Sequence, residues 1–174
     1  MDYLGLARSG IMNAVGDQDA PPQAVQGAIA DQMGGTMLAL AIMTALYERE
    51  GSGEGQEVDA SLLGSMSWLQ GLSVASRLMM GFEMVRFSRA ATWNALWNHY
   101  RCADDKWIAF AMAQADRYWA DLVAAIGVPE LATDERFATM EARGQNAEET
   151  IGRLDDVFAS RPRHEWVKIL DEGG

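Results

Sequence analysis

The sequence predicts an α/β protein in two units, on three observations. A long apolar helical pattern is followed by a short alternating segment and a second helical pattern, which is the alternation of strands and helices found in α/β proteins. Aromatic residues then gather in a stretch that predicts a β-hairpin, so the composition changes along the chain. The remaining sequence has the periodicity of amphipathic helices. We therefore expect a helix-rich α/β unit followed by a smaller α+β unit.

The first expected unit contains two helices and a strand. Gly, Asp and Pro residues predict a loop at 16–23. A helix is expected from about Asp31 to Glu50, because apolar residues recur every three or four positions and "GSGEG" ends the pattern. We expect this helix to be buried over most of its circumference. The segment "QEVDASLL", residues 56–63, alternates as a short strand does and leads into a helix of about 62–80.

The second expected unit begins with a hairpin. The sequence "HYRCADDKWIAFAM" predicts two strands joined by a turn at Asp104-Asp105. Helical patterns follow at 116–127, 146–161 and 162–174, and Asp116 is the expected N-cap of the first of them.

The predicted elements divide the chain into residues 1–80, a linker at 81–95, and residues 96–174. Both ends lie in apolar, periodic sequence, whereas domain termini are usually polar. We therefore expect a piece of a longer chain.

Composition limits the partners of this protein. The 174 residues are 49% hydrophobic, which is enough for a packed core. The formal charge of −11 argues against nucleic acid, whose binding depends on neutralising phosphates. A single cysteine, Cys102, favours a reducing compartment, so we expect a cytoplasmic protein. The longest apolar run, residues 37–47, is about half of a membrane span, and no membrane segment is expected.

Common catalytic motifs do not occur in the sequence. His99 and His164 belong to no metal-binding spacing, so no metal site is expected. The glycines of "GSGEG" precede the expected strand, and a helix-to-strand turn explains them better than a phosphate-binding loop. No serine lies in a G-x-S-x-G elbow.

Asp31 remains as a candidate functional residue, and it has two possible interpretations. As the N-cap of the long helix, its carboxylate would accept a hydrogen bond from an early amide and contribute about 1 kcal/mol. A carboxylate at a helix start is also suited to nucleophilic catalysis, because the helix dipole stabilises the anion and an ionised acid needs no base. Gly34 and Gly35, just behind it, leave space for a substrate to approach. The local pattern favours the cap.

Several segments together resemble family III CoA-transferases of the CaiB/BaiF type. They are "ARSGIM", "GAIADQMGG", "ALYEREGSGEGQEVDASLL", "NHYRCADDKWIAFAMAQADRYW" and "DERFATMEAR", in the family's order and spacing. The resemblance implies a fold in which residues 1–80 are the end of a Rossmann-like large domain and residues 96–174 most of a small one. It also implies a homodimer of interlocked full-length chains, with most CoA contacts on a segment outside this sequence.

The resemblance implies that Asp31 is the catalytic residue, with Gly34, Gly35 and Gln114 as substrate-binding residues. The reaction would move CoA from an acyl-CoA to a carboxylic acid through an aspartyl-acyl mixed anhydride. Coenzyme A thioester is then the substrate, and no tightly bound cofactor is expected. Residues 1–174 alone are expected to be inactive.

Two alternatives stay open. The related α-methylacyl-CoA racemases use the same aspartate as a proton-transfer base, but they tend to carry glutamate at the position of Gln114. The second alternative is a non-catalytic interaction domain, in which Asp31 only caps a helix.

Overall fold

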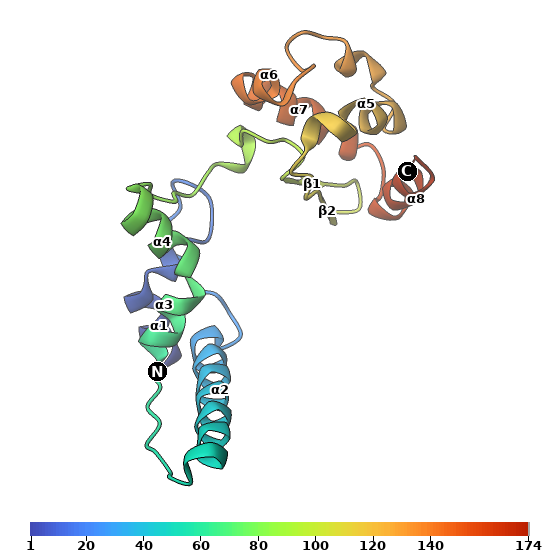
Figure 1. The fold of residues 1–174 in the computed structure, drawn as a ribbon. Coiled ribbons are helices and arrows are strands. Elements are labelled where there is room, and N and C mark those ends of the chain that lie inside the picture. The colour runs from blue at the N-terminus through green and yellow to red at the C-terminus, as the bar shows by residue number, and fades with distance from the viewer. Residues whose placement is uncertain (174) are drawn as a thin grey trace. The chain divides into compact units, whose positions relative to one another are not determined.

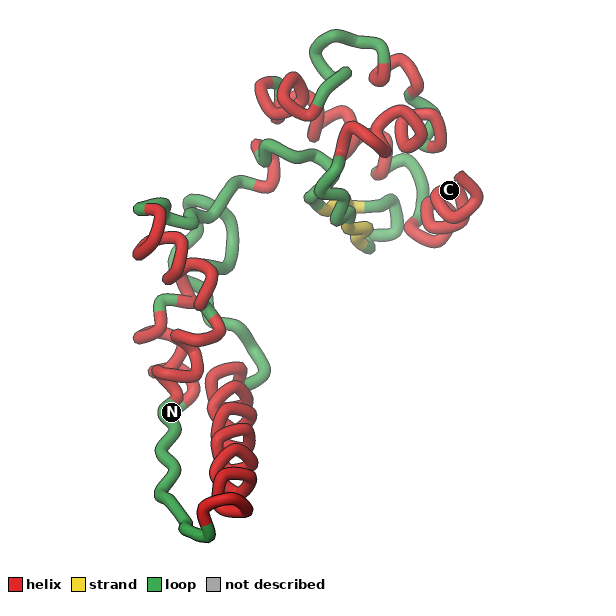
Figure 2. Tube along the Cα trace, in the orientation of Figure 1, coloured by secondary structure: helices red, strands yellow, loops and turns green. Residues whose placement is uncertain are grey.

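The computed structural model describes residues 1–173 as helices joined by loops, with one small sheet in that part of the chain (Figures 1 and 2). The chain divides into two compact units, Met1–Arg86 (unit 1) and Phe87–Gly174 (unit 2). The division falls inside the expected linker at 81–95. The architecture is thus mixed, with helices dominating both units.

Unit 1 consists of helices in its described residues. Its elements are α1 (Asp2–Ser9), the 3₁₀ helix η1 (Ile11–Asn13), α2 (Ile29–Ser52), α3 (Leu62–Leu69) and α4 (Gly71–Met80). Helices α1, α2 and α3 pack against one another. The core of this unit is small and contains Leu6, Ala30 and Met66 of these helices and Met12 of η1.

Helix α2 has the expected position but not the expected burial. It runs from Ile29 to Ser52, and Gly53, with φ of 74°, ends it in the left-handed conformation. Of its 24 residues only Ala30 and Gly34 are buried, so the prediction that most of its circumference is buried is wrong for this chain. The reason is that the described part of unit 1 contains no sheet against which the apolar residues could pack.

The predicted strand at 56–63 is also wrong. Residues 54–61 have no regular secondary structure, because a strand needs a partner for its backbone groups and unit 1 supplies none among its described residues. The helix expected over 62–80 forms as α3 and α4, which meet at Gln70. Ser61 caps α3 by accepting a hydrogen bond from the Gly64 N–H at 3.0 Å.

Unit 2 contains the sheet and a group of short helices. Its elements are η2 (Arg89–Ala91), β1 (His99–Arg101), β2 (Trp107–Ala109), α5 (Ala115–Ala125), η3 (Pro129–Ala132), α6 (Met140–Gln145), α7 (Ala147–Phe158) and α8 (Arg163–Gly173). Strands β1 and β2 are antiparallel, with Tyr100 opposite Ile108. The predicted hairpin is therefore confirmed, and its turn places Asp105 at φ of 59°.

Aromatic side chains form the centre of unit 2. The rings of Tyr100, Phe158 and Trp166 follow one another with centroid distances of 5.1 and 5.3 Å. The Tyr100 hydroxyl donates to the Ala95 carbonyl at 2.7 Å, and burial raises the pKa of Tyr100 well above its usual value. The indole N–H of Trp119 donates to the Leu131 carbonyl at 3.1 Å. Each buried polar group of these rings thus has a partner.

A buried cation joins α5 to α6. Arg143 is 2% exposed, lies 4.3 Å from the Trp119 ring and donates to the Asp116 carboxylate at 2.5 Å. Burial lowers its pKa, and the Asp116 carboxylate opposes that effect. The prediction that Asp116 caps its helix is wrong, because Gln114 occupies the N-cap position and Asp116 faces Arg143 instead.

Helix α2 also bears on the expectation about membranes. It is 24 residues long and, by length and composition, apolar enough to cross a bilayer, a requirement that core helices of soluble proteins also meet. The absence of a membrane segment therefore stays a prediction.

Candidate functional site

Asp31 lies in the first turn of α2 and is exposed. The N-cap position belongs to Ala28, which has no side-chain acceptor and adopts the left-handed conformation with φ of 53°. Asp31 follows this N-cap by three residues, inside the helix. The prediction that Asp31 is the N-cap is therefore wrong.

The capping carboxylate belongs to Asp2, at the start of α1. Its Oδ1 accepts hydrogen bonds from the N–H groups of Ala30, at 2.7 Å, and Asp31, at 3.2 Å. These are two of the amides that the first turn of a helix leaves without an internal partner. Sequence reasoning missed Asp2 because the local signal for a cap is an acceptor within a few residues, whereas Asp2 is 28 residues from Ala30.

The Asp31 carboxylate is left available. Within residues 1–173 it accepts no hydrogen bond and joins no ion pair, since the amides that it could have capped donate to Asp2. The N-terminal end of α2, which carries a partial positive charge, lies beside it. An exposed, ionised carboxylate without partners can act as a nucleophile or as a base.

Close packing between α1 and α2 brings Asp2 to this position. A Cβ atom on Gly5 would lie 2.9 Å from the Cβ of Ala30, closer than two carbon atoms can approach. Only glycine therefore allows the observed contact. Ala30 is fully buried here, one residue before Asp31.

The two glycines behind Asp31 have different surroundings. Gly34 is buried, and a Cβ there would overlap the Leu62 side chain of α3, so this glycine permits the packing of α2 on α3. A Cβ on Gly35 would meet nothing within 4 Å. The open side that Gly35 offers is the one that a substrate could use, and the substrate-binding roles of both glycines stay predictions.

Gln114 belongs to unit 2. It is exposed, occupies the N-cap position of α5 and makes no side-chain cap hydrogen bond. The structure thus brings Asp31, Gly34 and Gly35 together on one helix and places Gln114 in the other unit. Its role at the substrate stays a prediction.

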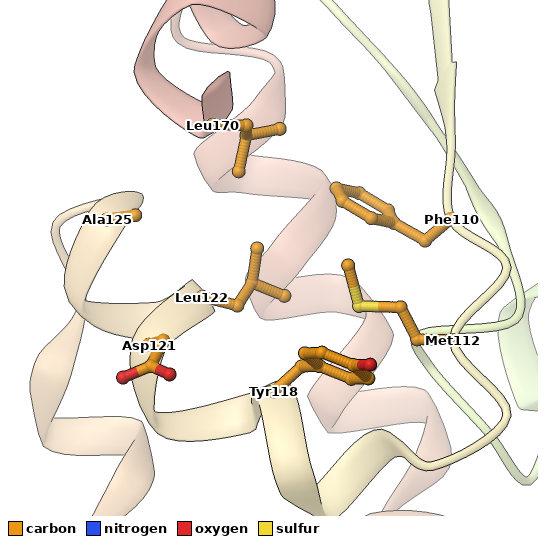
Figure 3. Close-up of a pocket in the computed structure, with 7 residues that line it drawn as sticks. All are labelled: Phe110, Met112, Tyr118, Asp121, Leu122, Ala125 and Leu170. Atoms are coloured by element: carbon orange, nitrogen blue, oxygen red, sulfur yellow. The ribbon is translucent and has the colours of Figure 1, made fainter. Parts of the chain in front are cut away.

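Unit 2 has a small apolar pocket that the sequence did not indicate (Figure 3). Its volume is about 110 Å³, and it lies between the chain after β2 and helices α5 and α8. The lining residues are Phe110, Met112, Tyr118, Asp121, Leu122, Ala125 and Leu170. Ligand pockets are usually several times larger, so this one has room for a small apolar group at most.

The described residues contain no recognisable metal-binding site. No group of three His, Cys, Asp or Glu side chains in residues 1–173 is arranged to hold a metal ion. The candidate site therefore rests on a single carboxylate and the helix end that carries it.

A sequence profile of CoA-transferase family III matches residues 1–174. The chain belongs to this family. The resemblance read from the sequence motifs is thereby confirmed, and so is the partial family fold. The Rossmann-like character of the first part stays a prediction.

Individual relatives agree with the assignment. Succinyl-CoA–D-citramalate CoA-transferase of Chloroflexus aurantiacus is 35% identical over 90% of this chain and 38% of its own length. Human α-methylacyl-CoA racemase is 28% identical over 98% of this chain and 42% of its own. A CaiB/BaiF family protein from Brucella suis superimposes with a TM-score of 0.89 at 29% identity, over 99% of this chain and 45% of its own. The chain thus spans less than half the length of these relatives.

Proposed function

We propose that this family III chain carries the catalytic aspartate of a CoA-transferase, which moves CoA from an acyl-CoA donor to a carboxylic acid acceptor. Asp31 is the proposed nucleophile. The observation that carries the proposal is its carboxylate, exposed in the first turn of α2 and relieved of the capping role by Asp2. Membership of the family and the names of the relatives support CoA transfer as the reaction class.

The proposed reaction begins when an Asp31 carboxylate oxygen attacks the thioester carbonyl. The C–S bond breaks, which gives an aspartyl-acyl anhydride and CoA thiolate. The acceptor carboxylate then attacks the carbonyl carbon of the Asp31 side chain and expels the donor's carboxylate, so a second anhydride forms. The thiolate attacks the acceptor's carbonyl in that anhydride, which yields the new thioester and restores Asp31. Each step exchanges good leaving groups, so the energy of the thioester is retained.

The test is to trap the covalent intermediate in the native protein. Incubation with an acyl-CoA and no acceptor, followed by hydroxylamine and mass spectrometry, is expected to convert Asp31 into its hydroxamate. The Asp31→Asn variant is the control and is expected to give no adduct and to lose turnover. Turnover retained by Asp31→Asn would overturn the proposal and support the non-catalytic interaction domain, because asparagine has no carboxylate with which to attack the thioester.

Racemisation at the α-carbon of an acyl-CoA is the second candidate, favoured by the similarity to human α-methylacyl-CoA racemase over nearly the whole chain. Asp31 would then move a proton rather than form an anhydride. Exchange of the α-proton for deuterium in heavy water, without a covalent adduct, would favour the racemase. Gln114 tilts the choice towards the transferase, since the racemases tend to carry glutamate there.

The remaining features of the proposal concern the whole protein. We propose a cytoplasmic homodimer of interlocked longer chains, with a Rossmann-like large domain that residues 1–80 complete and a small domain from residue 96. CoA thioester is bound as substrate, with no tightly held cofactor and no nucleic-acid or membrane partner. The net charge of −11 supports placing most CoA contacts on another part of the protein, because the cofactor is phosphorylated.

A further inference from the structure

We propose that Asp2 is a positioning residue for the reaction of Asp31. Its carboxylate fixes the first turn of α2, and with it the direction of the Asp31 side chain, without touching substrate. The inference rests on the proposed function of Asp31 and assigns a role to a residue on a different helix.

The hydrogen bonds are the first support. One oxygen of Asp2 accepts from both Ala30 and Asp31, so the acceptor binds the backbone of the reactive residue itself. Charge-assisted hydrogen bonds of this kind are stronger than neutral ones. The N-cap residue of α2, Ala28, offers no side chain that could replace them. The start of α2 therefore depends on an acceptor brought from α1.

The backbone before α2 is the second support. Gly27 and Ala28 both have positive φ, 95° and 53°, and alanine adopts this conformation only at a cost. Such a turn persists where its surroundings hold it in place. Asp2 restrains the residues that directly follow this turn, because it binds the amides of Ala30 and of Asp31 itself.

A second contact from α1 restrains the same place. Gly5 lies against Ala30, at the distance that only glycine permits. Asp2 and Gly5 stand three residues apart on α1, so they share a face of that helix. Together they hold Ala30 by its N–H and by its side chain. Asp31 is the next residue, and a turn restrained at Ala30 has little freedom to redirect it.

The consequence for catalysis is geometric. A nucleophile displaced by about 1 Å loses about 100-fold in rate, because the reacting atoms no longer meet at the required distance. Loss of the Asp2 hydrogen bonds frees the first turn of α2 and broadens the directions of the Asp31 carboxylate. The chemistry should slow, while the binding of CoA, held elsewhere, should change little.

The test compares Asp2→Ala with Asp2→Asn in the native protein. Asp2→Ala removes the acceptor, and we expect kcat per folded molecule to fall about 10- to 100-fold with KM within about twofold. Asp2→Asn keeps an oxygen acceptor and should recover most of the lost kcat. Hydrogen exchange supplies a readout independent of activity: the amides of Ala30 and Asp31 should exchange faster in Asp2→Ala and stay protected in Asp2→Asn.

Asp17→Ala is the matched control. The Asp17 carboxylate also accepts a backbone N–H, from Gln18 at 2.8 Å, but it lies in the loop between η1 and α2, eleven or more residues before α2 begins. This variant should leave kcat and the exchange of the Ala30 and Asp31 amides unchanged.

Three results would overturn the inference. One is an Asp2→Ala variant whose kcat per folded molecule stays within twofold of the wild type. Another is an Asp2→Asn variant as slow as Asp2→Ala, which would assign the effect to charge rather than to the hydrogen bonds. The third is unchanged exchange at Ala30 and Asp31 in Asp2→Ala. Failure of the proposed function is separate: there Asp31→Asn itself retains turnover, and the positioning role falls with it. If Asp31→Asn is inactive and Asp2→Ala is not, only the positioning role falls.

Discussion

Residues of the same type at the start of α1 and α2 have different contacts, and therefore different roles. Gly34 lies against Leu62, while Gly35, one position on, faces open space. Asp31 is free of partners, while Asp2, also at the start of a helix, holds two amides. The sequence alone does not distinguish the two glycines or the two aspartates. The residues that each one contacts in the fold determine its role.

Gly35→Ala should separate stability from activity. Nothing lies within 4 Å of a Cβ at this position, so the substitution should stabilise the exposed helix by about 1 kcal/mol. If substrate approaches along this side, as predicted, kcat/KM should fall about tenfold through lost alignment. Denaturant unfolding and steady-state kinetics of the native protein measure the two effects.

Gly51→Ala is the matched control for that experiment. It lies in the same helix with equally open surroundings, far along α2 from Asp31. Its substitution should leave turnover unchanged. Equal turnover in the two variants would remove Gly35 from the substrate site.

At the scale of elements, both long-range caps join parts of the chain that are distant in sequence. Asp2 of α1 caps α2, and Asp104, in the hairpin turn, caps α8 by accepting from the Arg163 N–H at 3.0 Å. The sequence predicts a turn at Asp104-Asp105 and nothing more. Hydrogen bonding by the Arg163 amide, with further help from Lys106, lowers the pKa of Asp104 to about 2.

The cap on α8 should make stability depend on pH in the acid range. A carboxyl whose pKa is lower in the folded chain stabilises the fold above its unfolded pKa, and that contribution disappears as the pH falls through the folded value. The stability advantage of the wild type over Asp104→Asn should therefore be full at pH 7, shrink below about pH 4 and vanish near pH 2. Thermal unfolding of both proteins across this range measures it.

Asp105→Asn supplies the comparison for the cap. Asp105 pairs with Arg101 on the surface, at 2.7 Å, and touches no helix end. Exposed pairs of this kind contribute little. A pH-independent difference between Asp104→Asn and the wild type would contradict the capping role.

At the scale of the whole molecule, the two units differ in how completely they bury their apolar residues. Unit 2 encloses an aromatic core, whereas unit 1 leaves much of α2 uncovered. The large exposed side chains of α2 include Leu38, Leu40, Ile42, Met43, Leu46 and Tyr47. Exposed apolar surface on this scale is typical of a site where another protein segment or a membrane makes contact. The relatives that this chain matches are more than twice as long.

Residues 1–174 produced alone should therefore show no transferase activity. The apolar face of α2 should also bind a hydrophobic dye and promote association that increases with concentration. A CoA-transfer assay with the isolated polypeptide, beside the native protein at equal active-site concentration, measures the first expectation. Measurable turnover by the isolated polypeptide would refute it.

The sequence by itself determined the features that depend on local order. The hairpin follows from alternation and a turn, the long helix from its period and the glycines after it, and the family from motifs spread along the chain. Asp31 is visible in one short segment as an acid beside two glycines near a helix start, but that local pattern favours a cap, and only the resemblance along the whole chain points to catalysis.

Tertiary structure decided what depends on distant partners. The segment 54–61 could not form a strand without a neighbour, and α2 stayed exposed without a sheet beside it. Asp2, not Asp31, caps α2, through a hydrogen bond from Ala30, 28 residues away. Asp104, in the hairpin turn, caps α8 through a hydrogen bond from Arg163, 59 residues away. Periodicity and propensity report only on near neighbours, whereas a hydrogen bond or a close contact depends on which residues folding brings within reach.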